Sequence, residues 1–540
     1  MSTTPSYAAL AQRLREHRVE VVFGLVGDAN LFFVDHWVRA LGGRYVGAVH
    51  EANAVMMAAG QARTTGAVGV ATVTHGPGLT NVVTPLVECV KSSIPLVVIA
   101  GRTSDQRRHA PQKIVQRPLV EATGAGFEEA RAADTVAADL DHAFWRARAE
   151  RRPIVLEVPI DLMWQEAAVS TDPVLVPPAL SPSAPDQDAV DTALGIVMSA
   201  RRPIVLAGQG ALDAREPLVR LARLLGAPLA CTAQAKGLFA GEAADLGIFG
   251  TLSTVTTQQV IADSDCILAF GASLTPETTD RGGLLDGRAV VQCDVDGSAI
   301  GRFVRPDAAI VADAAATATE LVRWLEEADA EPSTFAERAA ARLAEPPRRL
   351  AGPGRPGTVD LQDVLRHLDT VLPAQRTVVV DVGRFALHTL RVLSATDARS
   401  WLWAGAGFAS IGLGAGMAIG AAAARPERPT VLLAGDGGFV LGGLNEFVTA
   451  VQHGLDLVCV VANDGSYGAE HIQLTGRGMD PALSLLAWPD LAAVATALGG
   501  HGVTVTTPGD LAAVDEAIAG RTGPLLVDVR LDPDRVTSYE

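Results

Sequence analysis

Two polar side chains that could bind a metal ion follow two strand-like runs in the last third of the chain. Asp436 follows the apolar run 430–434 and lies in the Gly-Asp-Gly-Gly segment 435–438. Asn463 follows the apolar run 457–461. In a parallel sheet, ligand-binding groups collect at the carboxyl ends of the strands. A carboxylate and a carboxamide at two such ends would offer Mg²⁺ the oxygen ligands that it prefers.

The glycines around Asp436 favour an anion beside that metal. Gly435, Gly437 and Gly438 have no Cβ atom, so the main chain can approach an anion closely. A helix expected from about Leu441 would direct its N-terminal amides at the same place. A diphosphate bridged to the protein by Mg²⁺ would satisfy both features. Either turn alone is common in α/β proteins, and only the pair of turns indicates a site.

A second group of polar residues lies among the first hundred residues, again beside strand-like runs. Asp28 follows a strand and a glycine turn, Glu51 opens a helix, and His75 precedes a Gly-Pro-Gly turn. Each also has an interpretation that needs no ligand. Asp28 could be a helix N-cap, Glu51 could be stabilised by the helix dipole, and His75 could be a hydrogen-bonded turn residue.

These segments together resemble the acetolactate synthase and decarboxylase branch of the thiamine diphosphate enzymes, from one end of the chain to the other. The resemblance implies that Asp436, Asn463 and the carbonyl of Gly465 hold Mg²⁺. Ala462 stands where the family usually has a second Asn. Glu51 is implied to hydrogen-bond the pyrimidine ring of the cofactor, which turns the cofactor's own amine into the base that forms the thiazolium carbanion.

The same resemblance places further residues at the cofactor. Ile411 matches the bulky side chain that holds the two cofactor rings in position, although a core residue would also be apolar there. The residues implied to contact the cofactor, besides Glu51, are Ser410, Ile411, Gly435, Gly437, Gly438, Ser466 and Tyr467.

Roles in handling the substrate are carried over to three residues. Asp28 takes the position of a catalytic aspartate of pyruvate decarboxylases. Gln112 matches a glutamine of acetolactate synthase-type sites and stands where pyruvate decarboxylases have a His-His pair, which disfavours that activity. His75 replaces a small polar residue, and an imidazole there could transfer a proton near neutral pH. Glu470 and His471 correspond only loosely, and a solvated helix face is equally expected for them.

The implied activity is thiamine diphosphate- and Mg²⁺-dependent decarboxylation of a small-molecule 2-oxo acid, with release of an aldehyde or carboligation to a second carbonyl. Glu51, His75, Gln112 and Asp28 would be the catalytic residues. Two alternatives stay open: a carbon–carbon lyase or hydrolase acting on 2-hydroxy ketones or diketones with the same cofactor, and a non-catalytic nucleotide-binding or regulatory relative. Because different subunits hold the two ends of the cofactor in this family, a homodimer or homotetramer with active sites at the subunit interface is expected.

Two linker-like stretches divide the chain into three blocks. Residues 171–186 are rich in Pro and Ser, and residues 345–357 in Pro, Gly and Arg. Each block alternates strands with helices, which predicts an α/β protein of three doubly wound parallel-sheet domains. We expect a pyrimidine-binding domain over 1–170, a central Rossmann-like domain over 187–344 and a diphosphate- and Mg-binding domain over 358–540.

The middle block gives weak indications of a nucleotide. Gly208-Gln209-Gly210 is a fragment of a dinucleotide turn, without the third glycine and without an acidic residue at the usual distance. Acetolactate synthases that hold FAD have a turn rich in Arg and Asp where this chain has residues 271–277. FAD is therefore not expected.

Composition limits the partners and the compartment. The chain of 540 residues carries a formal charge of −17, which disfavours nucleic acid because phosphates need clustered Lys and Arg. The 5 cysteines indicate neither a disulfide framework nor a zinc site, and a cytoplasmic location is expected. The uncharged stretch 401–424 is long enough to cross a membrane, but its many Gly and Ala residues favour a loop and a buried helix.

Overall fold

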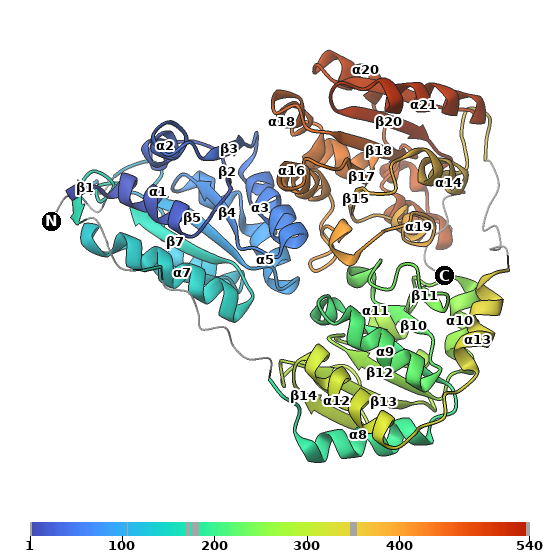
Figure 1. The fold of residues 1–540 in the computed structure, drawn as a ribbon. Helices are drawn as coiled ribbons and strands as arrows, with labels where there is room; N and C mark the ends of the chain where they lie inside the picture. Colours follow the sequence, from blue (N-terminus) through green and yellow to red (C-terminus); the bar gives the residue numbers. More distant parts are fainter. Residues whose placement is uncertain are drawn as a thin grey trace.

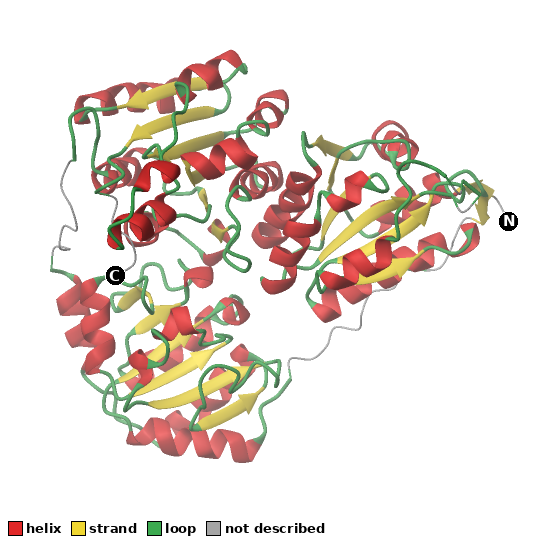
Figure 2. Ribbon diagram, turned by 180° about the vertical axis from the view of Figure 1, so that it is seen from behind, coloured by secondary structure: helices red, strands yellow, loops and turns green. Residues whose placement is uncertain are grey.

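The computed structural model describes residues 3–104, 106–107, 109–168, 173–174, 183–345 and 354–535. It contains three six-stranded sheets whose neighbouring strands run parallel. Helices cover both faces of each sheet (Figures 1 and 2). The predicted fold class of three doubly wound parallel-sheet domains is thereby confirmed. Much of both predicted linkers lies outside the described residues, so the domain boundaries stay predictions.

The N-terminal sheet has the strand order β3-β2-β4-β5-β7-β6. Its strands are β2 (Val21–Gly24), β3 (Arg44–Gly47), β4 (Gly69–Val73), β5 (Leu96–Arg102), β6 (Gly126–Glu129) and β7 (Ile154–Pro159). Its helices are α1 (Ser6–Glu16), α2 (Leu31–Asp35), α3 (Glu51–Thr65), α4 (Pro77–Thr80), α5 (Val83–Lys91), α6 (Gln116–Ala122) and α7 (Val136–Glu150). A short antiparallel pair, β1 (Thr3–Pro5) and β8 (Glu166–Ala168), joins the two ends of this domain.

The central sheet has the order β11-β10-β9-β12-β13-β14. Its strands are β9 (Pro203–Ala207), β10 (Leu229–Cys231), β11 (Asp245–Ile248), β12 (Cys266–Phe270), β13 (Ala289–Asp294) and β14 (Ala308–Val311). Its helices are α8 (Gln187–Ser199), α9 (Arg215–Leu225), α10 (Val255–Asp263), α11 (Pro276–Thr279), α12 (Ala314–Glu327) and α13 (Phe335–Leu343).

The C-terminal sheet has the order β16-β15-β17-β18-β20-β19, which repeats the pattern of the N-terminal sheet. Its strands are β15 (Thr377–Val380), β16 (Trp401–Trp403), β17 (Thr430–Gly435), β18 (Leu457–Asn463), β19 (His501–Val505) and β20 (Leu525–Arg530). Its helices are α14 (Leu361–Val371), α15 (Ala386–Val392), α16 (Gly414–Ala424), α17 (Asp436–Gly438), α18 (Phe447–Gln452), α19 (Gly468–Gly476), α20 (Leu491–Ala497) and α21 (Leu511–Gly520).

Both outer sheets place their functional candidates where the strand order reverses. The chain begins each sheet in an inner strand, β2 or β15, and then adds strands first on one side and later on the other. Their partners across the reversal are β4 and β17. Ligand-binding groups collect at the carboxyl ends of the strands beside such a reversal. Asp28, His75 and Asp436 follow β2, β4 and β17, so the topology places them at these strand ends.

Close packing of α3 against α16 joins the N-terminal and C-terminal domains, and the two helices face each other in Figure 1. Glycines make this approach possible. A Cβ atom on Gly420 would lie 1.8 Å from the carbonyl oxygen of Met57, and a Cβ atom on Gly60 would lie 2.0 Å from that of Met417. The helices therefore touch through their backbones, and the interface leaves no room for side chains at these two positions.

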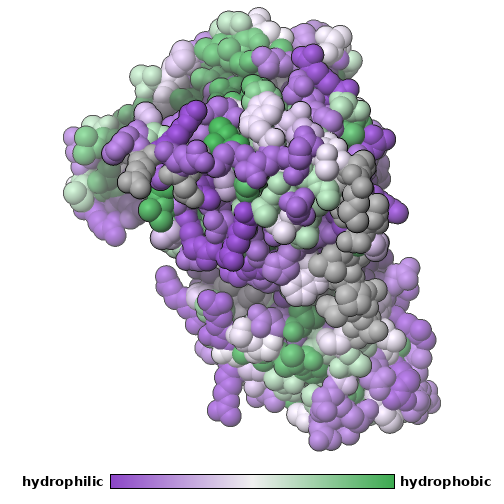
Figure 3. Space-filling model, turned by 90° about the vertical axis from the view of Figure 1, so that its left-hand side faces the viewer, coloured by the Kyte–Doolittle hydropathy of each residue, from purple (hydrophilic) through white to green (hydrophobic). Residues whose placement is uncertain are grey.

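The stretch 401–424 forms β16, a loop and the buried helix α16, as predicted. Within the described residues, no helix is long and apolar enough to span a bilayer. All five cysteines are buried and free. Hydrophilic residues cover much of the face seen in Figure 3, while the apolar side chains of the strands form the cores of the sheets.

Candidate functional site

Asp436 and Asn463 leave two neighbouring strands side by side. Gly435 of β17 is paired with Ala462 of β18, so the next residue of each strand starts from adjacent positions, about 4.8 Å apart across the sheet. Both side chains are buried. The amide nitrogen of Asn463 donates a 2.8 Å hydrogen bond to Oδ1 of Asp528, which turns the carbonyl oxygen of the amide the other way.

A loop that contains Leu486 and Trp488 donates hydrogen bonds to the other two metal-ligand candidates, Asp436 and Gly465. The indole Nε1 of Trp488 donates to Oδ2 of Asp436 at 2.8 Å. The backbone N–H of Leu486 donates to the carbonyl oxygen of Gly465 at 2.7 Å. Gly465 has φ 62°, a conformation that favours glycine. These contacts fix the direction of both groups, in the way that outer-shell partners orient metal ligands.

Asp436 is a buried carboxylate with a raised pKa. Burial, and to a smaller extent the negative charge of Asp464, raise its pKa to about 7. Hydrogen bonds from Gly437, Trp488 and Gly465 oppose this rise. In the described part of the chain, no Lys, Arg or His side chain pairs with Asp436. A bound cation would stabilise the ionised form.

Two further cofactor candidates of the C-terminal domain, Tyr467 and Ile411, lie against the same glycine turn. A Cβ atom on Gly437 would lie 2.8 Å from the ring of Tyr467, and one on Gly438 would lie 3.5 Å from Cβ of Ile411. Asp381 at the end of β15 holds the loop of Ile411, because its Oδ2 accepts the N–H of Gly412 at 2.9 Å. The structure thus brings these residues together around the turn.

The helix after β17 begins earlier than predicted. It starts at Asp436, as α17, and continues as the π-helical turn η7 (Phe439–Gly443), whereas the sequence suggested a start near Leu441. The reason is that Gly437 and Gly438 adopt helical backbone angles instead of forming a separate turn. The first amides of the helix consequently belong to the glycine segment itself.

Sequence reasoning missed a buried ion pair beside the metal-ligand candidates. Arg384 donates from Nε and Nη2 to Oδ2 of Asp464, at 3.1 and 2.7 Å. Oδ1 of Asp464 accepts the N–H and hydroxyl of Ser466, at 2.9 and 2.7 Å. Arg384 Nη2 also donates to the carbonyl oxygen of Pro533 at 2.7 Å. Arg384 therefore links the loop between Asn463 and Ser466 to the segment of Pro533, near the C-terminal end of the domain.

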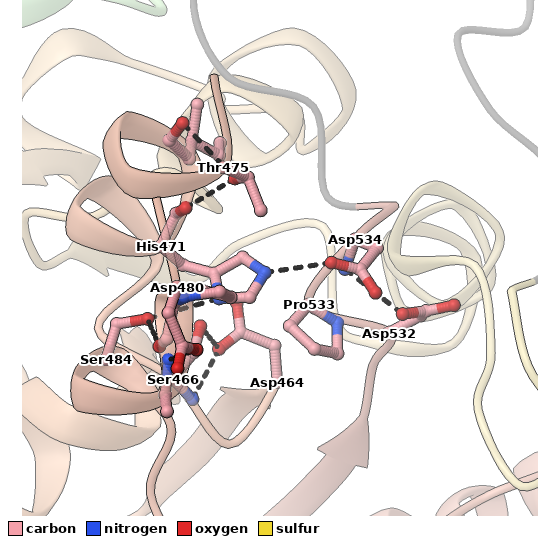
Figure 4. Close-up of polar contacts among 12 residues, drawn as sticks. Asp464, Ser466, His471, Thr475, Asp480, Ser484, Asp532, Pro533 and Asp534 are labelled. Carbon is pink, nitrogen blue, oxygen red and sulfur yellow. Dashed lines mark hydrogen bonds and ion pairs between the residues drawn. The ribbon is translucent and has the colours of Figure 1, made fainter. Parts of the chain in front are cut away.

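His471 has a structural position instead of a solvated one. It is buried on α19, and its Nε2 lies 2.8 Å from Oδ1 of Asp534 while its Nδ1 lies 3.2 Å from the hydroxyl of Ser484 (Figure 4). The imidazole thus joins α19 to the short helix η8 (Pro481–Ser484) and to the C-terminal segment. Glu470 is exposed. A cavity of about 360 Å³ runs along this helix, lined by Tyr467, Glu470, Gln473, Leu474, Arg477, Met479, Leu483 and Ser484.

Glu51 lies at the start of α3 with its carboxyl almost buried. Its Oε2 accepts a 2.9 Å hydrogen bond from the side chain of Asn81. The side chain of His50, not of Glu51, caps the helix, since its Nδ1 accepts the N–H of Ala52. The carboxyl of Glu51 therefore has one oxygen that is not used by these contacts.

Asp28, His75 and Gln112 come together at the Gly-Pro-Gly turn. Oδ1 of Asp28 accepts the hydroxyl of Thr74 at 3.1 Å and lies 3.8 Å from Nδ1 of the buried His75. A Cβ atom on Gly76 would lie 2.3 Å from the carbonyl oxygen of Gln112, so that segment packs directly on the turn. Asp28 is not the N-cap of α2, because Asn30 holds that position.

The glycine turn of the central domain packs against its neighbour across the strand reversal. Gly210 donates its N–H to the carbonyl oxygen of Gly271 at 3.0 Å, and a Cβ atom on Gly208 would lie 2.2 Å from that oxygen. The side chain of Gln209 donates to the carbonyl oxygen of Ser92 in the N-terminal domain. The turn thus contributes to docking of the domains.

The three blocks match three domains of one family. Residues 6–122 match the N-terminal TPP binding domain of thiamine pyrophosphate enzymes, residues 190–321 the central domain, and residues 381–529 the C-terminal TPP binding domain.

Curated relatives match along the whole chain. A Mycobacterium tuberculosis relative named for the acetolactate synthase large subunit is 30% identical and aligns over 97% of each chain. The acetolactate synthase of Mycobacterium leprae is 28% identical over 97% of this chain and 87% of its own. A Pseudomonas aeruginosa relative named for 2-ketoarginine decarboxylase is 29% identical over 97% of this chain and 93% of its own.

Proposed function

The chain belongs to the thiamine diphosphate enzymes and is an enzyme of their acetolactate synthase-like branch, and from this premise we propose that it decarboxylates a 2-oxo acid with the help of Mg²⁺. The product is either released as an aldehyde or coupled to a second carbonyl. The observation that carries the proposal is the set of three oxygen groups at the ends of β17 and β18, each oriented by its own hydrogen bond.

The residues of this site fit Mg²⁺. Asp436, Asn463 and the carbonyl of Gly465 would supply only oxygen ligands, which suits a hard cation. Trp488 donates to one oxygen of Asp436, and the metal would bind at the other. Burial and the neighbouring charge of Asp464 raise the pKa of this carboxylate to about 7, and a divalent cation beside it would stabilise the ionised form.

The groups proposed to hold thiamine diphosphate lie in two domains. Gly435, Gly437 and Gly438 would offer backbone amides to the diphosphate beside the metal, with Ser410, Ile411, Ser466 and Tyr467 around it. Glu51 would hold a proton between its free carboxyl oxygen and the pyrimidine ring. When bound, the cofactor supplies the acceptor for the electron pair that a departing carboxylate leaves behind.

Substrate binding is assigned to the N-terminal turn. His75 and Asp28 would handle a proton there, since Nδ1 of His75 lies 3.8 Å from Oδ1 of Asp28. Gln112 would orient the substrate through its amide. The relative named for 2-ketoarginine decarboxylase supports the inclusion of 2-oxo acids with a long basic side chain among the candidates.

We propose that the working form is a homodimer or homotetramer with active sites between subunits. Support comes from the family and from the division of the site residues between the N-terminal and C-terminal domains. FAD is not part of the proposal, because the central glycine turn packs against Gly271 and Ser92, at the strand ends where a dinucleotide would have to lie.

Product analysis tests the proposed function. Metal-stripped protein is supplied with thiamine diphosphate, with and without Mg²⁺, and offered pyruvate, 2-oxobutyrate and 2-oxo-5-guanidinopentanoate, each with and without an acceptor aldehyde. We expect CO₂ only when cofactor and metal are both present, and mass spectrometry identifies the other product. Cleavage of 2-hydroxy ketones without turnover of any 2-oxo acid would identify a lyase instead. A lack of cofactor-dependent turnover on the whole panel would favour a non-catalytic relative.

A further inference from the structure

We propose that Glu446 and Glu88 are reciprocal positioning residues: each domain uses one buried glutamate to hold the backbone that carries a cofactor-contacting residue of the other domain. Glu446 of the C-terminal domain holds the segment before Glu51. Glu88 of the N-terminal domain holds the segment before Ser410 and Ile411. This inference rests on the proposed function, because the importance of these segments derives from the cofactor.

Glu446 is fully buried at the N-terminal end of α18. Its Oε1 accepts the backbone N–H groups of Val49 and His50, both at 2.9 Å, and the side-chain amide of Asn53 at 3.3 Å. Its Oε2 accepts the hydroxyl of Thr449 at 2.9 Å. Three of the four donors come from the other domain, and they lie on both sides of Glu51 in the chain.

Glu88 is also fully buried, on α5. Its two carboxyl oxygens accept the backbone N–H groups of Gly407 at 3.2 Å and Phe408 at 2.7 Å. Its Oε1 also accepts the hydroxyl of Ser92, a residue of its own domain, at 2.7 Å. The amides of Gly407 and Phe408 lie just before Ser410 and Ile411 in the chain, with Ala409 between.

The two glutamates occupy equivalent places in two sheets of the same strand order. Glu88 lies on the connection from β4 to β5, and Glu446 lies on the connection from β17 to β18. The segments that they hold precede α3 and α16, which are also equivalent and pack against each other. Each of the two domains therefore holds the equivalent segment of the other across the same interface.

The chemistry of the carboxylates suits this role. Two buried N–H groups at the start of a segment need acceptors, and a buried carboxylate needs donors. A carboxylate that receives several charge-assisted hydrogen bonds holds its partners more firmly than a neutral acceptor does. A segment held in this way has less freedom to shift, and displacements of about 1 Å near the chemistry can cost about 100-fold in rate.

Different measurements test the two glutamates. In the holoenzyme with Mg²⁺ and thiamine diphosphate, Glu446→Ala should slow hydrogen–deuterium exchange at C2 of the bound cofactor about 10-fold or more. Glu88→Ala should instead weaken cofactor affinity about 10-fold or more. Amide exchange followed by mass spectrometry should show faster exchange at residues 49–50 in the first variant and at residues 407–408 in the second.

Conservative variants distinguish positioning from general support. Glu446→Gln keeps an oxygen for all three interdomain donors and should restore C2 exchange. Glu88→Gln must turn an amide nitrogen toward Gly407 or Phe408 and should stay impaired. Should an alanine variant fail to fold, Glu446→Asp or Glu88→Asp replaces it, since each keeps the charge but withdraws the oxygens by one methylene.

Asp265→Ala is the matched control. Asp265 also accepts two consecutive backbone N–H groups, those of Arg201 and Arg202, but it lies in the central domain. It should change neither cofactor measurement. Wild-type protein that shows no C2 exchange would overturn the proposed function itself. Wild-type exchange together with folded Glu446 and Glu88 variants that behave like the control would overturn the reciprocal positioning.

Discussion

The indole of Trp488 donates a 2.8 Å hydrogen bond to Oδ2 of Asp436, so an aromatic side chain 52 positions further along the chain fixes the direction of a buried carboxylate. Removing the donor frees the carboxylate to rotate and leaves Oδ2 with one donor fewer. Outer-shell partners of this kind change metal affinity by about 10-fold to 100-fold when they are lost. Under the proposed function, Trp488 is therefore a positioning residue for a metal ligand.

We predict that Trp488→Phe weakens Mg²⁺ binding about 10-fold in the presence of thiamine diphosphate, while the fold is retained. Calorimetric titration of the metal-stripped protein measures the change. Trp324→Phe is the control, because the Trp324 indole also donates to a carboxylate, Glu320, at 2.9 Å, but in the central domain. Equal metal affinity in the wild type and the Trp488 variant would show that the hydrogen bond does not orient a ligand.

The Arg384–Asp464 pair should behave as a buried ion pair with strong coupling. Both side chains are buried, so Arg384→Met leaves a charge without its partner and should lower the free energy of unfolding by about 3 kcal/mol. Asp464→Asn leaves the buried guanidinium of Arg384 without its partner and should lower the free energy of unfolding by a similar amount. The double variant should lose clearly less than the sum of the two single losses. Denaturant unfolding of metal-free protein gives the four values, and simple additivity would contradict the coupling.

A Gly→Ala substitution should destabilise the protein at Gly420, in the contact between α3 and α16, but stabilise it at Gly195 in α8. Gly420→Ala places a Cβ atom 1.8 Å from a backbone oxygen of Met57, so the helices must separate, and we expect a loss of about 1–3 kcal/mol. Gly195→Ala in α8 meets nothing within 4 Å and should stabilise the protein by about 0.5–1 kcal/mol. Thermal unfolding of both variants measures the difference. A neutral Gly420 variant would mean that the interface yields easily.

The sequence predicted the strand ends well, because apolar runs closed by glycine define where a buried parallel strand stops. Asp436, Asn463 and His75 could be found in this way. Their partners could not. Trp488 and Arg384 reach the site from connections without periodicity, and only the folded topology decides which strand end each connection approaches.

The buried position of His471 could not be predicted for a similar reason. The sequence shows that it lies on a helix, but its polar partners are Ser484 and Asp534, and Asp534 lies in the last turn of the described chain. Such long-range partners leave no local pattern. The start of the helix at Asp436 is hard to predict for a different reason, because consecutive glycines indicate a turn although they can also adopt helical angles.

His388 predicts a pH dependence of stability. Burial, with smaller contributions from Arg391 and Arg366, lowers its pKa to about 4 in the folded chain, against 6.5 for the unfolded state. Between these values the unfolded state binds more protons, so stability falls as the pH falls from 6.5 to 4, by up to about 3 kcal/mol. His388→Gln should flatten this dependence in denaturant unfolding at several pH values. Replacement of His501, an exposed histidine, should leave the slope unchanged.

Mixed oligomers test whether one active site uses two chains. Glu51→Gln and Asp436→Ala should each abolish turnover, since one removes the carboxyl proposed to hold the pyrimidine ring and the other a metal ligand. If these groups meet across subunits, a mixed dimer contains one site with both defects and one intact site. Random pairing of equal amounts then restores about a quarter of the wild-type activity. Coexpression of the two variants, with sedimentation analysis of the product, measures this recovery. If the assembled mixture has no activity, both groups of a site come from the same chain.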